Sequence, residues 1–264
     1  MTPTPDKDFP WWLLVTGALV AYLFFQVATD ELYSQILGTL SKGIGITIFV
    51  TLVAFSLASC LGLLLAIGSK SRFIVIRQIV RFYTEIVRGI PIIVLLLYVA
   101  FVLAPAMVVF WNWTTGHLGF DPIRTRDFSL LWRAIIALTI AYSAFIGEVL
   151  RAGLQSVEVG QIEAAEALGL NGWQRFRLIV FPQAIRTILP PLGNDFIAMI
   201  KDSSLVSVLG VLDITQLGKV TAVGNFRYFE TYNIVTLIYL TMTVSLSLVL
   251  RQLEKKLREK GHDT

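Results

Sequence analysis

The sequence predicts an all-α integral membrane protein with six transmembrane helices and both termini in the cytoplasm. Hydrophobic residues make up 55% of the chain, charged residues only 15%, and the mean hydropathy is +0.71, whereas soluble domains contain about 25% charged residues. The basic residues lie between apolar runs. Despite the net charge of +4, this placement indicates loops beside a membrane rather than a nucleic-acid-binding surface.

Six apolar stretches predict the transmembrane helices. A helix needs about 20 apolar residues to cross the hydrocarbon of a bilayer, where the backbone must satisfy its own hydrogen bonds. One stretch, residues 192–209, is apolar at both ends but carries Lys201 and Asp202 near its middle. The five clearer stretches are residues 11–28, 43–67, 90–111, 130–150 and 232–250.

The first stretch is predicted to be a retained helix rather than a signal peptide. Only Lys7 precedes it, and Gln26 with Ala28 makes a poor cleavage site.

The basic residues predict the orientation. With six spans, fifteen lysines and arginines lie on the face of the two termini and six on the opposite face. Because cytoplasmic loops carry the excess of positive charge, both termini are expected in the cytoplasm. Treating residues 192–209 as non-spanning would leave the basic C-terminal tail outside, which supports six spans. The six residues of the opposite face are Lys42, Arg124, Arg126, Arg133, Lys219 and Arg227.

The connection at 151–187 is predicted to fold as helix, tight turn, helix on the cytoplasmic side. Residues 163–168 are strong helix formers, and Gly169 stands where a left-handed cap would fall. Asn171 and Gln174 have the spacing of a capping box for a second helix. Pro182 is expected to end that helix.

The first helix of this connection is suited to contact with another molecule. Ala164, Ala165 and Ala167 have small side chains that allow a partner to approach closely. A DNA-binding helix-turn-helix is a second interpretation, but the connection is too short for the third helix of such a domain. A third interpretation is that residues 151–187 form only a surface connection between two spans.

The spacing of these residues resembles the signature loop of permease subunits of bacterial ATP-binding-cassette (ABC) importers. In that loop Glu-Ala-Ala, three residues and Gly form the helix that docks into the ATPase; here these are Glu163, Ala164, Ala165 and Gly169. Over residues 36–255 the chain resembles the polar amino-acid uptake branch of this superfamily, and in particular its general L-amino-acid members. It rests on the segments 47–67, 83–101, 145–169 and 181–210.

Two positions depart from this family. Phe181 stands where the family has Leu before the proline, and the helix at 11–28 is extra to the five-helix core. The resemblance therefore implies an N-terminal tail and extra helix at 1–35, a transmembrane domain at 36–255 with the coupling loop at 151–187, and a cytoplasmic tail at 256–264.

The resemblance also implies function and partners. The chain is expected to form half of the translocation pathway of an ATP-driven amino-acid importer in the bacterial cytoplasmic (inner) membrane, and not to be an enzyme. Expected partners are ABC ATPase subunits, a second permease subunit in a homo- or heterodimer, and an extracytoplasmic substrate-binding protein, but no nucleic acid. Opines or other amino-acid derivatives are an alternative substrate class. An ion-driven secondary carrier is an alternative mechanism, although no internal repeat supports it.

No catalytic, metal or cofactor site is predicted in this chain. The sequence lacks a Gly-x-x-x-x-Gly-Lys-Ser/Thr loop, so ATP and Mg²⁺ are expected on a separate ATPase chain. His117 and His262 are far apart, and Cys60, the only cysteine, is expected to be a small buried thiol.

Polar residues at membrane depth are the candidates for the pathway, because ionisable groups there face a partner or a wet cavity. Lys201 and Asp202, with Asn194, Ser203 and Ser204, are predicted to line or gate a path for a zwitterion. The equally weighted alternative is that Lys201 and Asp202 form a neutralised pair that holds two helices together at a dimer interface.

Two further features belong to this prediction. Glu148 is a second gate candidate, but it stands three residues before Arg151, a spacing that also predicts an ion pair within one helix. Pro190 and Pro191 are expected to start a helix after an extended entry.

Overall fold

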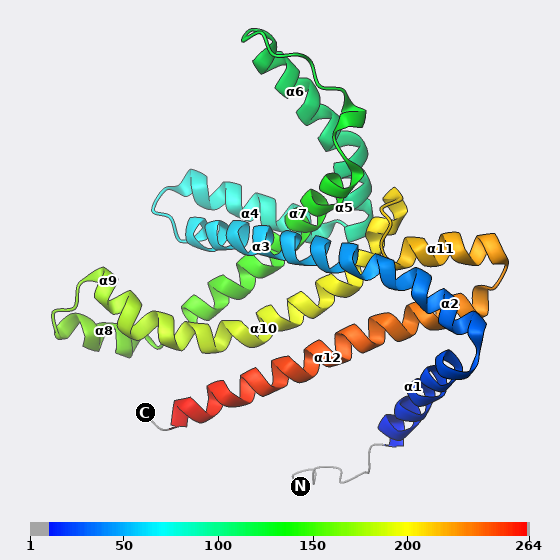
Figure 1. The fold of residues 1–264 in the computed structure, drawn as a ribbon. Coiled ribbons are helices and arrows are strands. Elements are labelled where there is room, and N and C mark those ends of the chain that lie inside the picture. The colour runs from blue at the N-terminus through cyan, green and yellow to red at the C-terminus, as the bar shows by residue number, and fades with distance from the viewer. Residues whose placement is uncertain (1–10, 263–264) are drawn as a thin grey trace.

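The computed structural model describes residues 11–262, and within them every regular element is helical. Lys7 and the other terminal residues lie outside this range. Figure 1 shows α3, α10 and α12 crossing the molecule while α6 projects from it. The helices are α1 (Trp11–Thr29), α2 (Glu31–Leu40), α3 (Ile44–Ser69), α4 (Ile74–Gly89), α5 (Ile92–Tyr98), α6 (Ala104–Gly116), α7 (Leu130–Gln155), α8 (Val159–Ala167), α9 (Gly172–Arg175), α10 (Phe181–Asp202), α11 (Ile214–Asn225) and α12 (Tyr228–His262), with short 3-10 segments η1 (Ser41–Gly43), η3 (Thr125–Asp127) and η5 (Ser203–Leu209) and π-helical turns η2 (Val99–Leu103) and η4 (Phe176–Val180).

Four helical stretches of the described chain are long and apolar enough to cross a membrane. α1 adds a shorter apolar helix, Leu14–Thr29. Together they cover the five clearer predicted stretches, which confirms the all-helical membrane fold. The stretch at 192–209 does not meet the same criterion, so the count of six spans stays a prediction. The four stretches are Glu31–Ser69, Ile92–Gly116, Leu130–Gln155 and Tyr228–Lys255.

The prolines do not interrupt the helices at the positions that the sequence predicts. α9, η4 and α10 form one helical run, so Pro182 does not end a helix and Pro190 and Pro191, inside α10, do not start one. Both predictions are wrong. The π turn closes with a bond from the Phe181 N–H to the Phe176 carbonyl, and Pro182 follows directly after this turn, inside the continuous helical run. Membrane helices also tolerate internal proline, because neighbouring groups satisfy the freed carbonyls.

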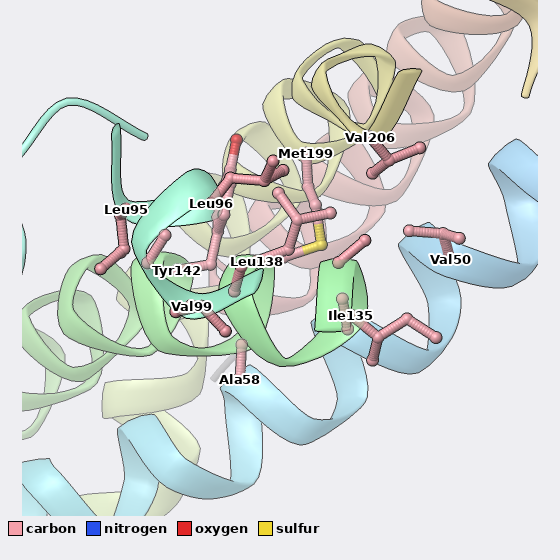
Figure 2. Packing of buried hydrophobic residues seen from close by; sticks show 14 of the residues in the cluster. Val50, Ala58, Leu95, Leu96, Val99, Ile135, Leu138, Tyr142, Met199 and Val206 are labelled. Atoms are coloured by element: carbon pink, nitrogen blue, oxygen red, sulfur yellow. The ribbon is translucent and has the colours of Figure 1, made fainter. Parts of the chain in front are cut away.

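The main core lies between α3 and α7, with α5, η2 and α10 packed around them (Figure 2). Small residues allow the close approach of α3 and α7: a Cβ on Gly62 would lie 3.0 Å from the Gly147 nitrogen. Leu138 and Met199 are fully buried in this cluster. Packing through small residues is typical of membrane helices, since lipid offers no hydrophobic drive for helices to associate. Cys60 lies on the exposed side of α3, so the prediction of a buried thiol is wrong.

A second cluster joins α2, α11 and α12. Asp213 is fully buried at the N-terminus of α11, where its carboxylate accepts bonds from the Gln216 N–H (2.8 Å) and the Tyr239 hydroxyl (3.2 Å). The backbone of Asp213 and Ile214 passes directly over Gly43. The start of α11 is therefore fixed to the start of α3.

Gly43→Ala is expected to destabilise the protein. The new Cβ would lie 2.6 Å from the Ile214 nitrogen and 2.7 Å from the Asp213 carbonyl carbon, and overpacking of this kind costs about 1–3 kcal/mol. Gly45→Ala is the matched control, because that Cβ meets nothing within 4 Å. Thermal unfolding of the detergent-solubilised variants measures the difference. Equal melting temperatures for the two would contradict the close contact.

Candidate functional site

The turn of the predicted coupling loop has the geometry that the sequence indicates. Gly169 adopts φ +75°, in the left-handed region. The N–H of Leu170 donates to the Ala165 carbonyl (3.1 Å) and that of Gly169 donates to the Glu166 carbonyl (2.9 Å). This pair of bonds is a Schellman motif, which satisfies the carbonyls at the end of α8. The prediction of a left-handed glycine cap is confirmed.

The second helix of the loop starts with the predicted capping box. The Asn171 side chain accepts from the Gln174 N–H, the Gln174 side chain accepts from the Asn171 N–H, and both distances are 3.0 Å. An ion pair between Glu166 and Arg175 joins α8 to α9. The two helices are therefore held as a fixed hairpin.

The four signature residues differ in accessibility. Glu163, Ala164 and Gly169 are exposed, whereas Ala165 is only 2% exposed because α8 packs against α9 and η4. The loop of its own chain covers Ala165, and the role of its small side chain in contact with a partner stays a prediction. α8 also begins at Val159, so Glu163 lies within the helix rather than at its N-terminus.

Large apolar side chains are exposed near the turn. Leu168 is 80% exposed and Trp173 68% exposed, and the Trp173 ring stacks on Phe176. Sequence analysis did not single them out, although large apolar residues beside a glycine turn are the available signal. They extend the exposed face of the loop beyond Glu163 and Ala164.

The loop packs against the C-terminal end of α7 and the N-terminal part of α10. Val157, Ala184 and Ile188 form a small buried cluster at its base, and the Ser156 hydroxyl donates to Thr187 at 3.2 Å. Since α7 enters the loop and α10 leaves it, a force on the hairpin acts on both helices.

The predicted pathway residues do not converge on one point. Asp202 is half-buried and accepts a 2.8 Å bond from the Tyr142 hydroxyl of α7. Ser203 is buried and donates to the Ile200 carbonyl (2.7 Å), and Ser204 is half-buried. Lys201 is exposed, and no ion pair between described residues joins it to Asp202.

α10 instead carries two polar rows. Asn194 and Lys201 are seven residues apart and both exposed. Asp195 and Asp202 have the same spacing, which places both carboxylates on one helix face. The Asp195 Oδ2 atom is buried and has no hydrogen-bond partner among the described residues. Sequence analysis missed Asp195, although its spacing from Asp202 is the signal that identifies it.

The predicted pair of Glu148 and Arg151 is confirmed. The Arg151 Nε donates to Glu148 Oε2 at 3.0 Å, and its Nη1 donates to Gln155 Oε1 at 2.8 Å. Both charged side chains are 35% exposed. The glutamate is therefore neutralised within its own helix in this conformation.

Comparisons with known proteins identify relatives of this chain. The family model of the binding-protein-dependent transport system inner membrane component matches residues 58–259. The "Probable amino-acid permease protein YxeN" of Bacillus subtilis (strain 168) is 34% identical over 86% of this chain and 94% of its own length. The glutamine transport system permease protein GlnP of Escherichia coli (strain K12) is 32% identical over 83% of this chain and 93% of its own.

Solved structures show the same fold. The crystal structure of an amino acid ABC transporter with histidines contains a chain that superposes with a TM-score of 0.70 and 32% sequence identity, over 83% of this chain and 94% of that chain. These relatives are permease subunits, which transport rather than catalyse. The chain thus has the type I ABC importer permease fold, and it belongs to the family of inner membrane components of binding-protein-dependent transport systems.

Proposed function

We propose that this chain is the transmembrane subunit of an ATP-driven amino-acid importer that forms half of the translocation pathway. The observation that carries the coupling part of the proposal is the fixed α8–α9 hairpin, which stands where α7 ends and α10 begins. ATP hydrolysis by a separate ATPase would push on Glu163, Ala164 and Leu168. The hairpin would pass this movement to the two helices.

The proposed assembly contains two ATPase subunits, this chain, a second permease subunit and an extracytoplasmic binding protein. Residues 36–255 are proposed as the transmembrane domain, preceded at 1–35 by the N-terminal tail and the extra helix and followed by the tail at 256–264. α2 runs across residue 35 and α12 across residue 255, so these boundaries mark function rather than breaks in the backbone. ATP and Mg²⁺ belong to the ATPase, and this chain needs no cofactor of its own.

The substrate is proposed to be an L-amino acid, as the names of the relatives suggest. Amino-acid derivatives such as opines are the second class. Proteoliposomes that contain the complex, the binding protein outside and ATP inside should accumulate a labelled amino acid. Accumulation without ATP but with an ion gradient would instead indicate a carrier, and accumulation of an opine alone would indicate the second substrate class.

The proposed orientation places the hairpin and both termini in the cytoplasm. A reporter that is active only in the periplasm is expected to be active after Gly38, Leu118 or Val220 and inactive after Gly172 or Gly261. The physical reason is the excess of lysine and arginine on the face of the hairpin. Expression of each fusion, measured by immunoblot, is the control. Activity after Gly172 would overturn the orientation and the docking of the ATPase with it.

A further inference from the structure

Arg133 is a buried arginine at the start of α7. Arg133 is only 6% exposed, and no ion pair between described residues includes it. The guanidinium donates instead to three backbone carbonyls: Phe128 (2.9 Å), Ala100 (2.9 Å) and Thr125. A buried charge is costly unless hydrogen bonds surround it, so this arrangement requires the fork of an arginine.

The three carbonyls come from different parts of the fold. Ala100 lies in the π turn η2, within the span that α5 and α6 form. A π turn interrupts the regular i to i−4 ladder, and a side chain inserted there can satisfy a carbonyl of the turn. Thr125 and Phe128 lie in and after η3, in the connection to α7. The Arg133 hydrogen bonds thus attach residues 125–128 of the connection at 117–129 to the interior of the neighbouring span.

A second contact attaches the middle of the same connection to α6. The Asn112 side chain of α6 donates to the Ile123 carbonyl (2.8 Å) and accepts from the Ile123 N–H (2.9 Å). The Asn112 bonds close the segment 113–123, which exposes Leu118 (73%) and Phe120 (63%). A segment that is held at both ends and exposes large side chains is suited to recognition, because little conformational freedom is lost on binding.

The position of this connection indicates its partner. It lies at the start of α7, and the α8–α9 hairpin lies at the end of that helix, about 39 Å away at 1.5 Å per residue. A binding protein and an ATPase act on opposite faces of the membrane. The family to which the chain belongs depends on a binding protein, and the hairpin is proposed to take the ATPase.

We propose that Arg133 is a positioning residue for the binding protein. It holds the connection at 117–129 in one conformation against the π turn, so that the exposed residues at its tip meet the binding protein already ordered. The role of Arg133 goes beyond the proposed function but rests on it. A loss of the arginine would weaken the encounter with the binding protein and leave the ATPase and its coupling hairpin intact.

The test measures ATP hydrolysis by the reconstituted complex against the concentration of substrate-loaded binding protein. Arg133→Gln is expected to raise the half-stimulating concentration by about tenfold, because glutamine cannot make all three hydrogen bonds that order the connection. The maximal stimulated rate and the rate without binding protein should stay within about twofold of wild type, equivalent to about 0.4 kcal/mol. Arg133→Lys keeps the charge but loses the fork, so it should rescue only part of the shift.

Two further variants keep the proposal falsifiable. Arg227→Gln is the matched control, because Arg227 is exposed, lies on the same predicted face and has Glu230 (3.4 Å) as its one ion-pair partner among the described residues; it should not move the half-stimulating concentration. Asn112→Ala removes the hydrogen bonds to Ile123 and leaves the buried charge of Arg133 in place. It should raise the half-stimulating concentration by several fold.

The outcomes separate the possible roles of Arg133. An unchanged half-stimulating concentration in both Arg133→Gln and Asn112→Ala, or an equal fall of basal and stimulated rates, would show that Arg133 only stabilises the fold and would overturn the proposal. If Arg133→Gln does not assemble, Asn112→Ala decides. A wild-type complex without any stimulation would contradict the proposed function itself, not the role of this residue.

Discussion

Gly169→Val is expected to abolish uptake and to remove the stimulation of ATP hydrolysis by substrate, while the protein still inserts in the membrane. Gly169 has φ +75°, a conformation that costs a residue with a β-carbon about 1–2 kcal/mol and a β-branched residue more. Relief of this strain would open the Schellman turn and separate α8 from α9. The hairpin could then no longer pass a movement of the ATPase to α7 and α10.

The loop offers a matched control for this prediction. Gly172→Val adds the same side chain three residues away, where φ is not positive and no atom lies within 4 Å of the new Cβ. Uptake and ATP hydrolysis are measured in reconstituted vesicles, and cosedimentation reports binding of the ATPase. Gly172→Val should keep most of its activity. Normal coupled activity in Gly169→Val would show that the hairpin is only a connector.

The burial of Ala165 refines the same experiment. Ala164→Trp adds bulk on the exposed face of α8, so it should block cosedimentation of the ATPase without unfolding the hairpin. Ala165→Trp adds the same bulk at a position that is 2% exposed, so it should disrupt the hairpin itself. Limited proteolysis of the loop distinguishes the two cases. Equal protease resistance of the variants would contradict the buried position of Ala165.

Local chemistry explains what could be predicted from the sequence of this loop. Gly169, Asn171 and Gln174 determine a turn and a capping box by bonds to residues within five positions, so no knowledge of tertiary contacts was required. The burial of Ala165 depends on how α9 and η4 pack against α8, which no local pattern contains. The π turn before Pro182 is likewise a property of the whole helical run, and a proline alone predicts a break.

Charged residues were harder to place than helices. The charge rule for orientation counts every arginine alike, so it treated Arg133 as a loop residue, although Arg133 is buried and donates to three backbone carbonyls, one of them Ala100 of the neighbouring span. Lys201 and Asp202 are adjacent in sequence, but adjacent residues of a helix point about 100° apart. The spacing of seven that joins Asp195 to Asp202 was the better guide to which side chains share a face.

Asp202→Asn is expected to lower uptake by at least about tenfold, equivalent to about 1.4 kcal/mol, with assembly and ATPase binding unchanged. Asp202 and Asp195 present two carboxylates to α7, and Tyr142 satisfies the first through its 2.8 Å bond, while one oxygen of the second has no partner among the described residues. We propose that this row lies at membrane depth and attracts the ammonium group of a zwitterion, because ionisable residues there usually mark a transport path. The asparagine keeps the size of the side chain, and its carbonyl oxygen can still accept the hydrogen bond from the Tyr142 hydroxyl, so only the charge is lost.

Tyr142→Phe separates the charge of Asp202 from its bond to α7. If the carboxylate serves the pathway, this variant should retain a larger share of uptake than Asp202→Asn, because the charge remains and only one hydrogen bond, worth about 1 kcal/mol, is removed. Lys201→Gln tests the exposed row of α10, and it should leave assembly intact because Lys201 makes no ion pair with a described residue. Uptake of a labelled amino acid and the yield of assembled complex are measured for all three variants. Full uptake in Asp202→Asn together with poor assembly in Tyr142→Phe would show that the bond between α7 and α10 is structural, and that the transport path runs elsewhere.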